Sequence, residues 1–253
     1  MTHAVIGYPS LALTTDIVLA MEKGGADFIE LQIPFSDPLA DGPIIMHACE
    51  RALRQGTKVS DAFTVATALK GKISIPLLFM AYYNTVFKFG VEKFCQKARK
   101  AGVLGLIVPD MPLEEETHEH LARYAKENNL HLIRMIAPVS DEKRLIKNAA
   151  VAEGFVYCSA RQGITGVRKE LPPNIVEYLK EARRFFDVPL AVGFGISKPE
   201  HVKKIAGHAD IAVVGSAIID LISKSDSKSL LPNITHFIRK LKISHSRQSY
   251  LID

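Results

Sequence analysis

Three acidic residues in one short segment are the first candidates for chemistry. Residues 27–43 read DFIELQIPFSDPLADGP, so Glu30 lies inside an apolar run while Asp37 and Asp41 follow it in a proline-rich loop. Burying an unpaired carboxylate is costly or raises its pKa, and two carboxylates in different surroundings can divide proton transfer from charge stabilisation. We therefore predict that Glu30 and Asp41 form a catalytic pair, whereas Asp37, within Ser-Asp-Pro, shapes the loop.

Each member of this pair also has a structural explanation. Glu30 could form an internal ion pair, for which Arg134 is the main basic residue within the other predicted strands. Asp41 precedes Gly-Pro and could be a turn residue. Position favours the catalytic interpretation, because both carboxylates belong to the same end of one strand.

The apolar run predicts a strand that carries Glu30 into the protein. Side chains alternate along a strand, so Phe28, Glu30 and Gln32 share one face, while the opposite face carries only isoleucine and leucine. In a closed barrel the apolar face packs against helices and the other face points inward. We therefore expect Glu30 inside a barrel, near its carboxyl-terminal rim.

Eight such apolar runs recur along the chain, separated by segments with helical spacing and capping signals. The predicted strands are residues 3–8, 27–33, 75–81, 104–109, 131–136, 154–159, 188–194 and 210–215. Eight strand–helix units favour a single α/β domain with a closed (β/α)8 TIM barrel over residues 1–243, followed by a short basic tail at 244–253. A doubly wound open sheet is the alternative, but no GxGxxG motif follows the first strand.

Glycines at the ends of the last two predicted strands suggest a phosphate site. Gly193 and Gly195 follow strand seven, and Gly215 and Ser216 open a helix after strand eight. Free N–H groups at a helix start favour an anion, and barrels of this kind bind phosphate at this position. The basic loop 160–169 could close over the site as a lid.

Composition makes several other functions improbable. The chain has 253 residues, no run of about 20 apolar residues, and a net charge of +5 that is thinly spread, so we predict neither membrane insertion nor nucleic-acid binding. The start lacks the features of a signal peptide, so we expect a cytoplasmic protein. Cys49, Cys95 and Cys158 are isolated, which argues against disulfides and zinc.

Two catalytic classes lack their residues at the predicted rim. No strand end carries the lysine that a Schiff-base aldolase needs. His131 begins its strand, at the wrong end, and His118 and His120 lie on a predicted outer helix, so we predict no metal site. Acid–base chemistry on a phosphorylated substrate remains.

Taken together, the sequence motifs resemble the family of tryptophan synthase α subunits over nearly the whole chain. The segment IELQIPFSDPLADGP is similar to the family signature, and YYN, VPDMPLEE, GITG, GFGIS and VGSAI follow in family order. The resemblance implies retro-aldol cleavage of indole-3-glycerol phosphate to indole and glyceraldehyde 3-phosphate, without a cofactor in this chain. It also implies an α2β2 heterotetramer in which indole passes to a β subunit carrying pyridoxal phosphate.

The resemblance assigns roles to individual residues. Glu30 would transfer protons and Asp41 would hold the indole N–H. Two further residues would line the site and its lid: Tyr157 and Thr165. Five would bind the substrate, chiefly through its phosphate: Gly166, Gly193, Gly195, Gly215 and Ser216. Three would lie towards the β subunit: Asp37, Pro38 and Asn84.

Three positions depart from the family pattern. Gln32 stands where glycine is usual, Tyr8 replaces an aspartate and Ala160 replaces a serine. Gln32 could crowd the pocket or hydrogen-bond Glu30, and we expect no counterpart of the helix that usually precedes the first strand. A weakened or inactive lyase that mainly activates the β subunit is therefore the alternative function. Another phosphosugar barrel, such as an isomerase, is a third.

Overall fold

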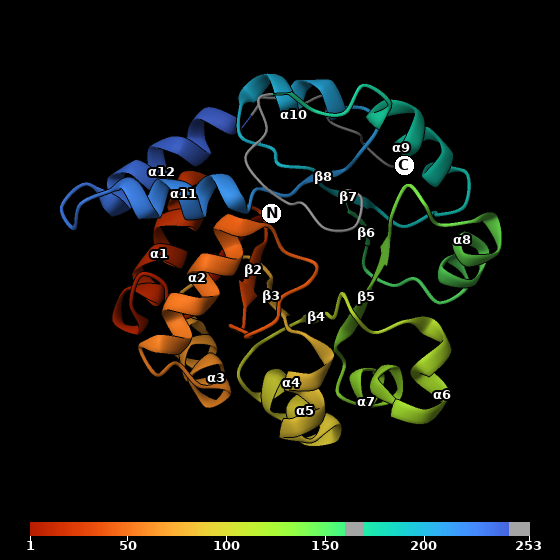
Figure 1. Cartoon of the computed structure of the whole chain (residues 1–253), viewed down its shortest axis with the longest axis horizontal. Coiled ribbons are helices and arrows are strands. Elements are labelled where there is room, and N and C mark those ends of the chain that lie inside the picture. Colours follow the sequence, from red (N-terminus) through yellow and green to blue (C-terminus); the bar gives the residue numbers. More distant parts are fainter. Residues whose placement is uncertain (160–169, 243–253) are drawn as a thin grey trace, which may run out of the picture.

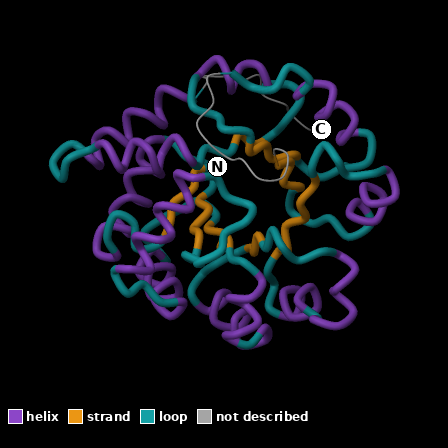
Figure 2. Tube along the Cα trace, viewed as in Figure 1, coloured by secondary structure: helices purple, strands orange, loops and turns teal. Residues whose placement is uncertain are grey.

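A ring of eight parallel strands forms the centre of the molecule. The structure is a computed structural model that describes residues 1–159 and 170–242. The strands are β1 (Thr2–Val5), β2 (Ile29–Gln32), β3 (Leu77–Met80), β4 (Gly105–Ile107), β5 (His131–Ile136), β6 (Val156–Ser159), β7 (Leu190–Gly193) and β8 (Ile211–Ala212). They pair in chain order, so neighbours in sequence are neighbours in space (Figure 2).

The ring is closed between its first and last strands. Thr2 forms a parallel bridge to Val214, His3 N–H donates to the Val214 carbonyl at 3.0 Å, and Val214 N–H donates to the Met1 carbonyl at 3.0 Å. These contacts confirm the predicted closed barrel and leave no open sheet.

Helices surround the barrel as an outer layer (Figure 1). They are α1 (Leu11–Gly24), α2 (Pro43–Arg54), α3 (Val59–Leu69), α4 (Tyr83–Phe89), α5 (Val91–Lys100), α6 (Glu116–Glu119), α7 (Leu121–Glu127), α8 (Glu142–Ala149), α9 (Ile175–Arg183), α10 (Pro199–Ile205), α11 (Ser216–Lys224) and α12 (Leu230–Leu241), with a 3₁₀ turn η1 (Leu113–Glu115). In the described part of the chain no helix has the length and apolar character needed to cross a bilayer.

The outer helix predicted to carry His118 and His120 is broken. His120 adopts a left-handed conformation with φ of 58°, which interrupts the helical path between α6 and α7. Glu119, just before the break, accepts a hydrogen bond from the Tyr83 hydroxyl on α4. A tertiary contact thus accompanies the break, and the sequence pattern alone does not reveal it.

The barrel has an inner and an outer core, as the alternation in β2 predicts. Ile29 and Leu31 are fully buried in the outer core between strands and helices, whereas Phe28 contacts the inner cluster, its ring centroid 6.1 Å from that of Phe155. Four aromatic rings pack in the outer core around β3, α3 and α5, with centroid separations of 5.1 to 6.4 Å: Phe63, Phe79, Phe89 and Phe94.

Candidate active site

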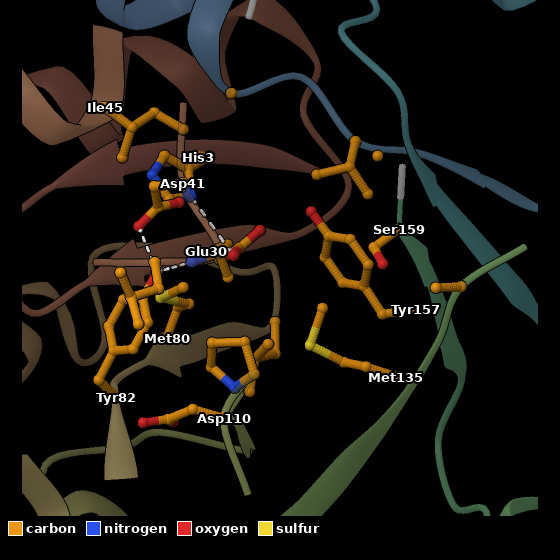
Figure 3. A pocket seen from close by; sticks show the side chains of 18 of the residues that line it. His3, Glu30, Asp41, Ile45, Met80, Tyr82, Asp110, Met135, Tyr157 and Ser159 are labelled. Atoms are coloured by element: carbon orange, nitrogen blue, oxygen red, sulfur yellow. Dashed lines mark hydrogen bonds and ion pairs between the residues drawn. The ribbon is translucent and has the colours of Figure 1, made fainter. Parts of the chain in front are cut away.

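A cavity of about 560 Å³ opens at the carboxyl-terminal end of the barrel. Its lining includes Glu30 and Asp41 on one side and Tyr157 and Ser159 across from them (Figure 3). The carboxyl ends of parallel strands meet at one rim, which is why residues distant in sequence gather here. The predicted lid at 160–169, with Thr165 and Gly166, and the tail at 244–253 lie outside the described residues.

Glu30 is buried inside the barrel, as predicted, but its partner is a histidine. The strand register pairs Glu30 with His3 on β1, and His3 Nδ1 lies 3.3 Å from Glu30 Oε1. Burial opposes a charge on His3, yet the adjacent Glu30 carboxylate, aided by Asp41, raises the pKa of His3 above its usual value. The adjacent carboxylate therefore favours the protonated form of His3.

Arg134, the partner considered from sequence, lies on the wrong face of its strand. Its neighbours Ile133 and Met135 contact the inner cluster, so Arg134 between them points outward, where it lines a separate surface pocket with Leu113 and Asn148. Sequence reasoning missed His3, although the signal was present: a polar residue in the first strand, opposite Glu30 once β1 and β2 pair in parallel.

Asp41 is held in place by two donors, which makes it more than a turn residue. Its Oδ2 accepts hydrogen bonds from Gln32 Nε2 at 2.6 Å and from the Tyr82 hydroxyl at 2.9 Å. The Tyr82 oxygen in turn accepts the Ala40 N–H at 2.9 Å. Burial raises the pKa of Asp41, while His3 and the two donors oppose that rise. The net effect is a raised pKa, and the carboxylate is buried and oriented by its two donors.

The expectation that Gln32 crowds the cavity or bonds Glu30 is wrong. Its side chain is completely buried and donates to Asp41, and Gln32 does not line the cavity. Tyr8 is also buried away from the cavity, with the Arg51 guanidinium 5.6 Å from its ring centroid. Two of the three family departures therefore leave the cavity unobstructed, and Ala160 lies outside the described residues.

Tyr157 lies across the cavity from the carboxylates, and its ring explains why residue 193 is a glycine. A Cβ on Gly193 would lie only 2.7 Å from the Tyr157 hydroxyl oxygen, so the ring occupies the space that a side chain there would need. Burial raises the pKa of Tyr157 well above its usual value, with Glu30 and Asp41 acting in the same direction. Its hydroxyl therefore stays protonated.

The end of the cavity next to the start of α11 has the features of an anion site. Gly195, with φ of +74°, and Gly215 and Ser216 at the start of α11 all line the cavity. The first N–H groups of a helix lack partners within the helix and carry partial positive charge. This end of the cavity can therefore hold a phosphate, as the sequence predicts.

The residues predicted to face a partner have different surroundings. Asp37 and Asn84 are exposed, but Pro38 is buried, and its neighbour Leu39 is 83% exposed instead. Asn84 belongs to helix α4. On α4 the Phe87 side chain is 56% exposed.

The closed barrel, with buried carboxylates in a cavity at its carboxyl-terminal end, has the architecture of a (β/α)8 barrel enzyme. Residues 1–245 match the family model for the tryptophan synthase alpha chain. The chain belongs to this family.

Named relatives and solved structures agree with the family model. The chain is 45% identical to the tryptophan synthase alpha chain of Desulfotalea psychrophila over 92% of this chain and 91% of the relative. It is 41% identical to that of a Thermoanaerobacter species over 96% and 92%. It also resembles the structure of Mycobacterium tuberculosis tryptophan synthase (TM-score 0.87, 31% identity, 95% and 89% covered). A tryptophan synthase complex from Pyrococcus furiosus is similar too (TM-score 0.86, 31% identity, 95% of each chain covered).

Proposed function

We propose that this chain cleaves indole-3-glycerol phosphate into indole and glyceraldehyde 3-phosphate. The observation that carries the proposal is one cavity whose lining includes Glu30, Asp41 and the Gly215–Ser216 helix start. Such a cavity suits a substrate that has a carbon atom to be protonated, an aromatic N–H donor and a terminal phosphate.

Cleavage requires one proton to be placed on the ring and one to leave the side chain. The indole C3 gains a proton, the adjacent glycerol hydroxyl loses one, and the carbon–carbon bond breaks as its electron pair returns to the ring. Glu30 transfers both protons, because its buried carboxylate lines the cavity that holds the substrate. Asp41 accepts the indole N–H and stabilises the positive charge that develops on the ring.

The remaining residues bind and shape the substrate. Tyr157 bounds the indole pocket, and the N–H groups around Gly195, Gly215 and Ser216 bind the phosphate. Thr165 and Gly166 are assigned to the lid and the phosphate by sequence motif. In this mechanism no cofactor in this chain takes part, because proton transfer alone balances the reaction.

A β subunit is the partner that the family supports, and we propose an α2β2 complex in which indole passes to pyridoxal phosphate on that subunit. Exposed apolar side chains follow the carboxyl ends of three strands: Leu39, Phe87 and Val139. Together with Asp37 and Asn84, they form what we call the rim patch. The three cysteines are free and buried, which fits a reducing cytoplasm.

The test is indole release from indole-3-glycerol phosphate by the purified chain, with and without a β subunit. Release that increases with the β subunit and is abolished in Glu30→Ala would establish the lyase. A stimulated β reaction without any release would instead support the silent activator. Turnover only of phosphosugars that lack an indole would support an isomerase.

A further inference from the structure

The catalytic wall holds a buried histidine to which the proposed reaction assigns no role. His3 and Glu30 are 4% and 3% exposed, and both line the cavity. Figure 3 shows His3 beside Asp41, with the ion pair running from His3 to Glu30. A charged pair inside a barrel is costly to bury, so its presence at the reaction centre calls for a specific use.

The pair leaves one oxygen of Glu30 available. Oε1 lies 3.3 Å from His3 Nδ1, whereas Oε2 is buried and has no hydrogen-bond partner among the described residues. A buried oxygen without a partner is unfavourable unless a ligand satisfies it. Substrate in the cavity is the available partner.

We infer that His3 is a positioning residue for the lyase: it holds Oε1 of Glu30 through Nδ1 and thereby presents Oε2 as the oxygen that exchanges protons with the substrate. This inference rests on the proposed function. His3 orients the carboxylate through the contact of Nδ1 with Oε1; it does not itself exchange protons with the substrate.

The packing around His3 fixes its ring. The backbone N–H of His3 donates to the Val214 carbonyl, and a Cβ placed on Gly215 would lie 3.4 Å from His3 Cβ. The contacts that close the barrel therefore also hold His3 in position. The charged and titratable groups that face the pair come from several elements: Glu30 on β2, Asp41 before α2, Tyr157 on β6, and the Met1 amine next to β1. Both carboxylates favour the charged histidine.

The experiment measures kcat, KM and their pH profiles for wild type, His3→Phe and His3→Asn. His3→Phe removes the donor, so we expect kcat to fall about tenfold or more with little change in KM. The pH profile of kcat, including its acid limb, should change as well, because the titrating histidine beside Glu30 is removed. The amide nitrogen of asparagine can occupy the Nδ1 position, so His3→Asn should recover most of kcat. His131→Asn, an exposed histidine at the amino-terminal end of β5, is the matched control and should behave as wild type.

A second readout requires no turnover. The pKa of His3, measured by ¹⁵N NMR in the folded chain, should fall in Glu30→Gln because the adjacent negative charge is lost.

An active wild type whose kcat and acid limb are unchanged in His3→Phe would overturn the inference. An equal loss of kcat in His3→Phe and His3→Asn, with an unchanged pH profile, would also overturn the inference, because such a result indicates structural damage. If the histidine variants do not fold, an unaltered His3 pKa in Glu30→Gln would overturn it. Absence of indole release by wild type would count against the proposed function itself, while the NMR measurement would still test the pair.

Discussion

At the scale of single residues, the Asp41 carboxylate depends on its neighbours. Two donors, Gln32 and Tyr82, converge on one oxygen of Asp41 and leave the other for a substrate. Hydrogen bonds to a charged group contribute about 1.5–3 kcal/mol each, roughly twice the neutral value. Gln32 is therefore part of the support for the site.

We predict that Gln32→Gly lowers kcat/KM for indole release about tenfold, from the loss of one charged hydrogen bond. Burial already raises the pKa of Asp41, and losing the amide removes one group that opposes this rise. The acid limb of kcat/KM should consequently move to higher pH, because Asp41 must be ionised to accept the indole N–H. The control is Gln55→Gly, an exposed glutamine whose side-chain amide donates to the Pro9 carbonyl. Increased cleavage in Gln32→Gly would instead support crowding of the pocket.

The sequence could locate Glu30 and Asp41 but not the hydrogen bonds around them. Alternation along β2 predicts that Glu30 points inward, and this prediction is confirmed. The direction of Gln32 depends on the return of the loop that brings Asp41 back over the strand, which spacing alone does not define. His3 required the register between β1 and β2, a tertiary property.

At the scale of elements, the eight strands and their parallel order were predictable because runs of buried apolar residues have the right length and number. Except for β5, the observed strands are shorter than the apolar runs, since several runs continue into the rim loops that carry the site. The break at His120 was not predictable, because a left-handed residue inside a helical pattern reflects its tertiary surroundings.

The aromatic cluster between β3 and the helices provides a test at this scale. Phe94 is completely buried among Phe63, Phe79 and Phe89. Phe94→Ala should lower the free energy of unfolding by about 3–5 kcal/mol, through lost burial and the remaining cavity.

Urea denaturation followed by circular dichroism measures this change. Phe87→Ala is the matched control because Phe87 is 56% exposed, and it should stay within about 0.5 kcal/mol of wild type. A similar loss of unfolding free energy in both variants would contradict the assignment of the Phe94→Ala effect to the buried aromatic cluster.

At the scale of the whole molecule, the barrel presents one functional end. The cavity and the rim patch lie at the carboxyl ends of the strands, so a partner bound there would cover the cavity mouth. This arrangement suits transfer of a released product between subunits without passage through bulk solvent.

Phe87→Asp should weaken binding to the β subunit about tenfold or more, because a desolvated charge replaces an apolar contact. Isothermal titration calorimetry with the purified β subunit measures the change. Leu104→Asp is the control: this residue is 40% exposed and precedes β4, at the other end of the barrel. Unchanged affinity in Phe87→Asp would place the interface elsewhere.

The seam between β1 and β8 has a consequence for synthesis on the ribosome. Helix α12 packs on α1, where Thr235 bonds the Ala20 carbonyl at 3.0 Å, and Lys242 bonds Asp27 at 3.0 Å. A nascent chain whose synthesis has reached only β7 therefore exposes the unpaired edge of β1 and the apolar side of α1. Exposed edges of this kind promote aggregation. The last strand and helices thus act as the closing step of folding, and nascent chains that stall before them are natural clients for chaperones.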